Sequence, residues 1–226
     1  MSVQHGAPSS LLRLVAGLLL LGLFLALAWV VLGLPQQAEG LRPAVAENIA
    51  VSGVTHPVTA VLLNFRGYDT LLELAVLLLA LLGVWSLGRA AAPKEASPGV
   101  VLDNLPRLLL PLMVLVAGYL LWRGAVGPGG AFQAGAVLGA AGVLLYLAGW
   151  RLASRWEGWR LRLLLVAGVA VFVAVAVGVM FSSGVLLAYP PGMAGLLILL
   201  VEAVASVSIG VTLLALYLGG EPGGHP

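Results

Sequence analysis

The chain contains no cysteine, and only 9% of its 226 residues are charged. Without cysteine it forms no disulfide, offers no thiolate to an iron–sulfur cluster or a zinc ion, and has no cysteine nucleophile. Soluble domains carry about 25% charged residues, so a charged fraction this low excludes an ordinary soluble domain. The formal net charge of +2 is too small to indicate a nucleic-acid partner.

Side chains that perform catalysis or bind metals are also scarce. The three histidines, His5, His56 and His225, lie outside the apolar runs, which argues against paired haem ligation inside a membrane. The sequence has no Ser-His-Asp arrangement, phosphate-binding loop or HExxH motif. We therefore expect a chain that is not an enzyme and that holds no metal or cofactor of its own.

Long apolar runs fill most of the sequence, of which 61% is hydrophobic. A helix that crosses the lipid bilayer needs about 20 apolar residues. Six stretches are candidates: 10–34, 68–88, 105–123, 131–150, 162–182 and 192–218. We therefore predict an all-α integral membrane protein with about six transmembrane helices. Residues 56–64 are apolar but too short to cross, and we expect a short helix at the membrane interface or dipping into it.

The polar connections set the expected boundaries and orientation. The largest hydrophilic break predicts a linker at 91–103, between a two-span unit (1–90) and a four-span unit (104–218), with a disordered tail at 219–226. Six spans put both termini on one side, and that side holds eight of the eleven cationic residues. The positive-inside rule then predicts that both termini are cytoplasmic.

Three charged side chains stand where the second predicted span begins: Arg66, Asp69 and Glu73. One interpretation is a helix cap, in which Asp69 or Thr70 is the N-cap and Glu73 reaches back to a free amide as in a capping box. The other is ionic, because Asp69 and Glu73 are four residues apart and share a helix face, where they would form a stop for a proton or a cation. The two are compatible, since a cap can line a water-filled cavity.

A second carboxylate lies deeper, because the nine residues from Met193 to Val201 precede Glu202 in the sixth predicted span. At a helical repeat, Ala205 and Ser206 share its side. An ionisable residue inside a membrane usually faces the bundle interior and marks an ion or proton route. The alternative is a hydrogen bond to a neighbouring helix that serves only packing. Its partner is open at this point: Glu73, a water chain or another subunit.

Glycine is concentrated around the connection between the third and fourth predicted spans, in WRGAVGPGGAFQAGAVLGAAG (122–142). Gly129 and Gly130 belong to a sharp break in the chain. Gly135 and Gly139 belong to a small-residue face that lets another helix approach closely. We interpret the region as a tight turn followed by a packing helix, with a backbone ion site at the turn as the alternative.

HPVTAVLLNFRGYDTLLE (56–73) resembles the segment usually written N-V-V-T-A-I-L-L-D-F-R-G-F-D-T-L-G-E. That segment occurs near the carboxyl end of the large A subunit of Mrp-type multisubunit Na⁺/H⁺ antiporters, as well as in a small subunit of related membrane-bound hydrogenases. The turn at 123–135 resembles the R-G-H-N-x-P-G-G-G-F-x-G-G motif of the four-span B subunit, whose last span usually has a glutamate before small residues, as at Glu202.

The chain departs from these motifs at several positions. Asn64 stands where the first motif has aspartate, and Leu72 where it has glycine. Ala125 and Val126 replace the histidine and asparagine of the turn, so a role that depends on that histidine is lost. The chain also lacks the long antiporter-like portion of an A subunit.

The resemblance implies an accessory membrane subunit of a multisubunit Na⁺/H⁺ antiporter, or of an antiporter-like module in a respiratory complex, in the plasma (inner) membrane of a prokaryote. Implied partners are larger antiporter-like subunits and other small membrane subunits, and the implied cargo is Na⁺ or H⁺. In this hypothesis Asp69 and Glu73 form an outer carboxylate station, Glu202 forms a buried one, and Arg66 keeps Asp69 ionised. The alternatives are a structural scaffold without an ion path, the membrane arm of a hydrogenase-like redox complex, and a self-sufficient small transporter.

Overall fold

The computed structural model describes residues 10–34, 40–87, 99–150, 158–190 and 192–219. Regular structure in these ranges is helical throughout, as the apolar runs predict. The chain divides into two compact units, Met1–Pro43 and Ala44–Pro226.

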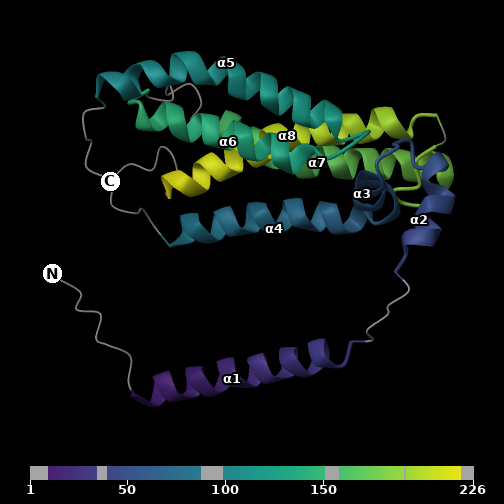
Figure 1. Cartoon of the computed structure of the whole chain (residues 1–226), viewed down its shortest axis with the longest axis horizontal. Helices are drawn as coiled ribbons and strands as arrows, with labels where there is room; N and C mark the ends of the chain where they lie inside the picture. The colour runs from purple at the N-terminus through teal and green to yellow at the C-terminus, as the bar shows by residue number, and fades with distance from the viewer. Residues whose placement is uncertain (1–9, 35–39, 88–98, 151–157, 191, 220–226) are drawn as a thin grey trace. The chain divides into compact units, whose positions relative to one another are not determined.

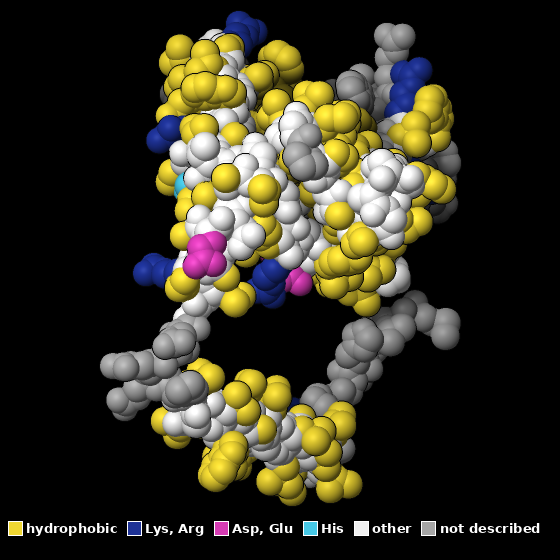
Figure 2. Space-filling model, turned by 90° about the vertical axis from the view of Figure 1, so that its right-hand side faces the viewer, with side chains coloured by type: hydrophobic (Ala, Val, Ile, Leu, Met, Phe, Trp, Pro, Cys, Tyr) yellow, Lys and Arg dark blue, Asp and Glu magenta, His cyan; other side chains and the backbone are white. Residues whose placement is uncertain are grey.

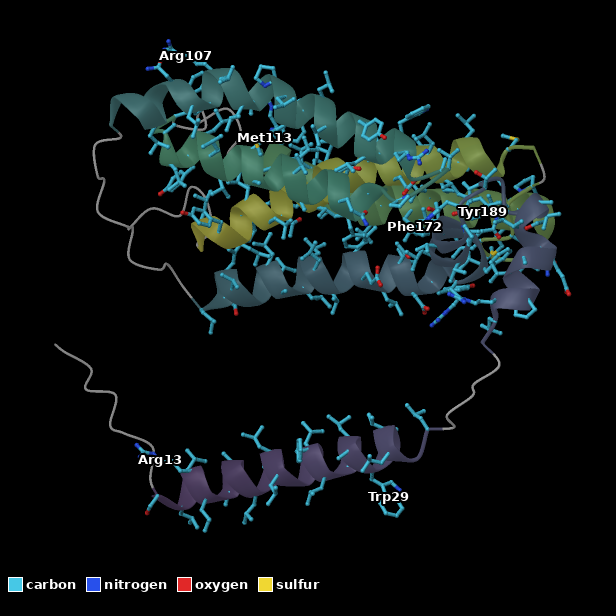
Figure 3. All side chains as sticks on the ribbon, viewed as in Figure 1. Arg13, Trp29, Arg107, Met113, Phe172 and Tyr189 are labelled. Carbon is cyan, nitrogen blue, oxygen red and sulfur yellow. The ribbon has the colours of Figure 1, made fainter. Side chains whose placement is uncertain are left out.

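The first unit contains α1 (Ser10–Leu32), a helix of 23 residues. Apolar side chains occur all around it, and none of its residues is buried. A helix that is apolar on every side is typical of a membrane span. Arg13 and Trp29 lie toward its two ends (Figure 3), where cationic and indole side chains anchor a span at the interface.

The second unit is built on five long helices that run alongside one another (Figure 1). They are α4 (Gly67–Ser86), α5 (Val100–Arg123), α6 (Ala131–Leu147), α7 (Trp159–Ser183) and α8 (Ala194–Leu218). Helix α8 packs against each of the other four, so it is the central helix of this unit. Its Ile198, Val201 and Ile209 form a core with Phe172 of α7, and all four side chains are fully buried or nearly so.

Many large hydrophobic side chains on these helices are exposed, and in the view onto one end of the bundle hydrophobic side chains lie around its outside (Figure 2). Leu72 of α4, Leu115 of α5 and Leu163 of α7 are all more than half exposed. Such a surface suits hydrocarbon, where helices satisfy their own backbone hydrogen bonds. Five helices (α1, α4, α5, α7 and α8) are long and apolar enough to cross a membrane, and α6, with 17 residues, is shorter. The prediction of about six membrane helices is confirmed, and the chain is a multi-pass membrane protein.

Short helices precede α4. They are α2 (Arg42–Asn48), the 3₁₀ helix η1 (Ile49–Val51), α3 (Pro57–Ala60) and the π-helical turn η2 (Val61–Phe65). The short helix predicted within residues 56–64 is therefore present. The backbone leaves the helical region at Arg66 (φ −129°, ψ 36°), so a break separates η2 from α4.

Two expected boundaries differ from the structure. The end of the predicted linker at 103 is wrong, because α5 begins at Val100 after the extended backbone of Gly99, and it continues through Pro106 and Pro111. The compact units divide at Pro43 and not at the linker, since α4 packs on α7 and α8. Residues 91–98 of the predicted linker and 220–226 of the predicted tail lie outside the described residues.

Candidate functional site

The carboxyl group of Glu202 is buried between α8 and the start of α6. Glu202 is only 4% exposed, and its Oε1 accepts a hydrogen bond from the Ala131 amide at 3.3 Å. Ala131 is the first residue of α6, where the backbone amides have no partner within the helix and the helix dipole is positive. The partner that the sequence left open is therefore, in this chain, a backbone amide.

The turn that delivers this amide depends on glycine. Gly130 has a φ of +116°, a backbone conformation that residues with a side chain rarely adopt. A methyl group added to Gly130 would also lie 2.7 Å from Glu202 Oε1. Its amide donates to the Leu120 carbonyl at 2.9 Å, which ties the turn back to the last turns of α5. Gly130 therefore holds the α6 start against the carboxyl group with no room for a side chain.

The turn is recessed relative to the neighbouring helix. Glu202 lies eight residues after Ala194, about 12 Å along α8 at 1.5 Å per residue. Helix α6 runs parallel to α8, because Gly135 lies against Ser206 and Ile209 and Gly142 lies against Leu214. Helix α6 begins level with Glu202 and is about 25 Å long, whereas α8 is about 37 Å long. The start of α8 therefore extends beyond the start of α6.

A segment from before α4 docks onto this recessed turn. The Thr59 hydroxyl donates to the Gly124 carbonyl at 2.6 Å, and the amides of Thr55 and His56 donate to the Ala125 carbonyl at 3.0 and 3.1 Å. The Thr59 hydroxyl proton is used on Gly124, so the 3.3 Å contact with His56 has the ring Nδ1–H as its donor. The sequence did not single out Thr59, because a threonine within an apolar run carries no signal of a partner 65 residues away.

Small and hydroxyl side chains let α8 lie close to α6 and α7. A methyl group at Gly135 would lie 2.7 Å from Ile209 Cβ, and one at Gly139 would lie 3.2 Å from the Gly210 carbonyl. On the other side, the Ser208 hydroxyl donates to the Leu165 carbonyl of α7 at 2.7 Å. The Ser206 hydroxyl donates to the carbonyl of Glu202 itself, one turn back in α8, at 2.6 Å. The small-residue face expected around Gly135 and Gly139 is thus turned toward α8.

The outer charged residues lie on a different surface. Arg66 and Asp69 form an ion pair whose side chains are 61% and 44% exposed, and exposed pairs contribute little to stability. Glu73 is exposed and makes no hydrogen bond or ion pair within the described part of the chain. Neither acid is bonded to Glu202, so the structure does not join the two predicted carboxylate stations.

The capping interpretation of this segment is wrong. Helix α4 begins at Gly67, three residues before Thr70, and no side chain caps it. The Thr70 hydroxyl donates instead to the Leu62 carbonyl at 2.7 Å. The reason is that the break after the π-helical turn Val61–Phe65 falls at Arg66, which places Thr70 inside α4 and not at its N-cap.

The connection between α7 and α8 places the buried phenol of Tyr189 at the end of the bundle where α4 begins (Figure 3). The hydroxyl of Tyr189 has no hydrogen-bond partner among the described residues. Burial raises the pKa of Tyr189 to about 12. No group of three or more His, Asp or Glu residues in the described ranges is arranged to hold a metal ion.

Two family models match the chain. Residues 101–219, more than half of its length, match the model described as "Domain related to MnhB subunit of Na+/H+ antiporter". Residues 11–102 match the model of the E subunit of MBH. The two matches meet at residues 101 and 102, at the start of α5.

A relative and two solved structures are similar to the chain. A probable K⁺/H⁺ antiporter protein of Rhizobium meliloti (strain 1021), named as a combined A/B subunit, is 30% identical over 157 residues, which cover 56% of this chain and 15% of that protein. A chain of the archaeal membrane-bound sulfane sulfur reductase complex matches with a TM-score of 0.70 at 24% identity, over 92% of this chain and 97% of that one. A chain of the Mrp complex from Dietzia sp. DQ12-45-1b matches with a TM-score of 0.68 at 24% identity, over 98% of this chain and 27% of that one. The chain thus spans a small part of the curated relative, and the likeness to the solved structures shows a shared fold.

Proposed function

The chain belongs to the family of domains related to the MnhB subunit of Na⁺/H⁺ antiporters, and we propose that it is an accessory subunit of a multisubunit cation/proton antiporter or of an antiporter-like module in a respiratory complex. In this role it packs against larger antiporter-like subunits and other small membrane subunits, and it lines part of a route for Na⁺ or H⁺. The antiporter name of the curated relative and the structural matches within two multisubunit membrane complexes support this proposal. We place the chain in a prokaryotic plasma membrane with both termini cytoplasmic, following its cationic residues.

The observation that carries the ion route is the buried carboxyl group of Glu202. Its Oε1 accepts the Ala131 amide proton, and its second oxygen accepts no hydrogen bond from the described residues. An oxygen with open lone pairs inside a span is able to bind a proton or a cation. We assign Glu202 as the buried station of the route, with Asp69 and Glu73 as an outer station and Arg66 as the residue that keeps Asp69 ionised.

A structural role for Glu202 is the second candidate, and the same hydrogen bond favours it. The Ala131 amide is one of the free donors at the start of α6, and Glu202 supplies the acceptor that no local cap residue provides. In this case Glu202 fastens α6 to α8 and moves no ion. The chain would then be a membrane scaffold.

Glu202→Gln separates the two roles. The amide oxygen of the glutamine side chain still accepts the Ala131 proton, but the side chain no longer takes up a proton or carries a negative charge. The ion-route proposal expects cation-dependent proton movement in everted membrane vesicles to fall to background, while the complex still assembles. Glu47→Gln is the matched control, because Glu47 is exposed on the short helix α2. Glu73→Gln tests the outer station in the same assay.

Each result has a defined meaning. Normal transport by both Glu73→Gln and Glu202→Gln would refute the ion route and leave the scaffold. Transport by the purified chain alone in liposomes would instead refute the subunit role in favour of a small transporter.

Co-purification from native membranes in a mild detergent identifies the parent complex. Antiporter-like subunits alone would indicate a free exchanger driven by an ion gradient. The same subunits with iron–sulfur or nickel proteins would indicate a redox-driven complex, in which we assign this chain no catalytic role and no cofactor of its own.

A further inference from the structure

The carboxyl group of Glu202 is nearly enclosed, but one of its oxygens is still reached from outside the chain. Among the described residues, two side-chain polar atoms are both fully enclosed and without a hydrogen bond, Trp85 Nε1 and the Tyr189 hydroxyl oxygen. The second oxygen of Glu202 accepts no hydrogen bond within these residues either, yet it is not one of those two atoms. The 4% of Glu202 that is exposed therefore includes this oxygen, and a narrow opening leads to it.

The side chain of Gln133 lies close to this carboxyl group. It is exposed on the first turn of α6, whereas Gly130, just before that turn, is buried. A methyl group added at Gly130 would lie 2.7 Å from Glu202 Oε1 and 3.7 Å from Gln133 Oε1. The two side-chain oxygens are therefore no more than about 6.4 Å apart, the sum of these two distances. One or two water molecules span such a gap with hydrogen bonds.

Helix capping does not explain the position of Gln133. A glutamine at the third residue of a helix is able to cap it by accepting the amide proton of the residue before the first turn. In α6 the Gly130 amide donates instead to the Leu120 carbonyl, and no side chain caps the helix. Gln133 makes no hydrogen bond within the described part of the chain, so its amide has donors and an acceptor free for water.

The depth of Gln133 also favours water beside it. Because α6 begins about 12 Å along α8, Gln133 is exposed beside the interior of a span and not at its end. An amide that faces hydrocarbon without a hydrogen bond is costly. The side chain therefore needs polar partners outside α6, and the nearby Glu202 oxygen needs the same. Asp69 and Glu73 do not supply them, because both are on α4 and neither is bonded to Glu202.

We propose that Gln133 is a positioning residue, which holds the water through which a proton reaches Glu202 at the start of α6. This inference rests on the ion route proposed above and gives its buried station an entrance separate from Asp69 and Glu73. A hydronium ion beside the Gln133 amide transfers a proton to the second oxygen of Glu202. The carboxylate becomes a neutral carboxyl group, a water molecule is left behind, and the reverse transfer releases the proton. A hydrated metal cation is too large for an opening that exposes only 4% of Glu202.

The first test measures proton movement in everted membrane vesicles that contain the whole complex. Gln133→Leu keeps the size of the side chain but removes its hydrogen-bonding groups, so we expect proton movement to slow at least several-fold. Gln133→Asn keeps an amide and should restore most of the wild-type rate. Thermal unfolding should be unchanged in both variants, since Gln133 is exposed and makes no hydrogen bond within the described residues. Ala136→Leu is the matched control, because it adds a leucine on the same exposed face of α6 without removing a polar group.

The second test measures water at the entrance and does not depend on transport. Because the chain has no cysteine, Gln133→Cys introduces its only thiol. A membrane-impermeant methanethiosulfonate reagent reacts with the thiolate, which forms where water is present. We expect this variant to be labelled in native membranes, with the label found on this chain by mass spectrometry. Ala140→Cys is the control, because position 140 is exposed on the same face two turns further along α6 and should react much more slowly.

The outcomes separate this inference from the ion route itself. Loss of transport in Glu202→Gln with a normal rate in Gln133→Leu would keep the route and overturn the entrance. Equal slowing by Gln133→Leu and Ala136→Leu would overturn it too, because the effect would then be one of packing. So would equal labelling, or no labelling, of the two cysteine variants. Normal transport by Glu202→Gln would instead refute the route on which the inference rests.

Discussion

The contact between α6 and α8 gives the sharpest prediction about packing. A methyl group added at Gly135 would lie 2.7 Å from both Cβ and Cγ2 of Ile209 and 3.0 Å from the Ser206 carbonyl. Cβ and Cγ2 of Ile209 are close to the α8 backbone, and the Ser206 carbonyl is part of it. None of these atoms can move away unless α8 itself shifts. Gly135→Ala must therefore push α6 and α8 apart or strain both.

The magnitude follows from comparison with a glycine in open space. Overpacking a core by one methyl group costs about 1–3 kcal/mol. Exchanging glycine for alanine inside a helix stabilises the folded state by about 1 kcal/mol. Gly178→Ala in α7 receives only the second effect, because nothing lies within 4 Å of the added methyl group. The two variants should therefore differ by about 1–3 kcal/mol in their free energy of unfolding.

Thermal unfolding of the purified chain in a mild detergent measures this difference. For a chain of this length, 1 kcal/mol corresponds to about 2–4 °C, so Gly135→Ala should unfold about 2–12 °C below Gly178→Ala. Gly142→Ala should fall between them, because its 2.8 Å contact is with the mobile Cδ2 of Leu214. If Gly135→Ala unfolds at or above the temperature of Gly178→Ala, the close approach of α6 and α8 is refuted.

Two further predictions concern the end of the bundle near α3. Thr59→Val removes the hydroxyl that donates to the Gly124 carbonyl at 2.6 Å, so we expect a loss of about 1–3 kcal/mol in thermal unfolding, with Thr59→Ser retaining most of the wild-type stability. Tyr189→Phe removes a buried hydroxyl with no partner among the described residues, so near pH 7 it should leave stability unchanged or raise it by about 1–3 kcal/mol. Because burial raises the pKa of Tyr189 from 10.0 to about 12, the folded state favours the neutral phenol. This contribution is fully present below about pH 10 and is lost as the pH rises toward 12, so stability measured across that range should fall in the wild type and fall less in Tyr189→Phe. An identical pH profile for the two proteins would contradict the burial of this phenol.

The long helices were predictable because the length and composition of each apolar run are enough to indicate a membrane span. A run of about 20 apolar residues has one stable form in a membrane, so α1, α4, α7 and α8 appear where composition places them. The start of α5 was less predictable, because Asp103 suits either a polar connection or a helix end that leaves the hydrocarbon. The unit boundary was not predictable at all, since the packing of α4 on α7 and α8 depends on surface complementarity between distant segments.

The same distinction explains what the sequence indicated about the candidate site. A glutamate in a span and a glycine-rich turn are each visible as local exceptions, because one is costly in hydrocarbon and the other breaks a helix. The contact between Glu202 and the turn cannot be predicted from the sequence, because it depends on the position of the turn along α8. Helix α6 is about 12 Å shorter than α8, so its first amide lies beside Glu202 and not beside the start of α8. The recessed turn has backbone carbonyls that need hydrogen-bond donors. Thr59 of α3 and the residues just before α3 supply these donors. A short helix between long ones, with a glycine turn at its start, is therefore the sequence signal that would have paired Glu202 with the turn.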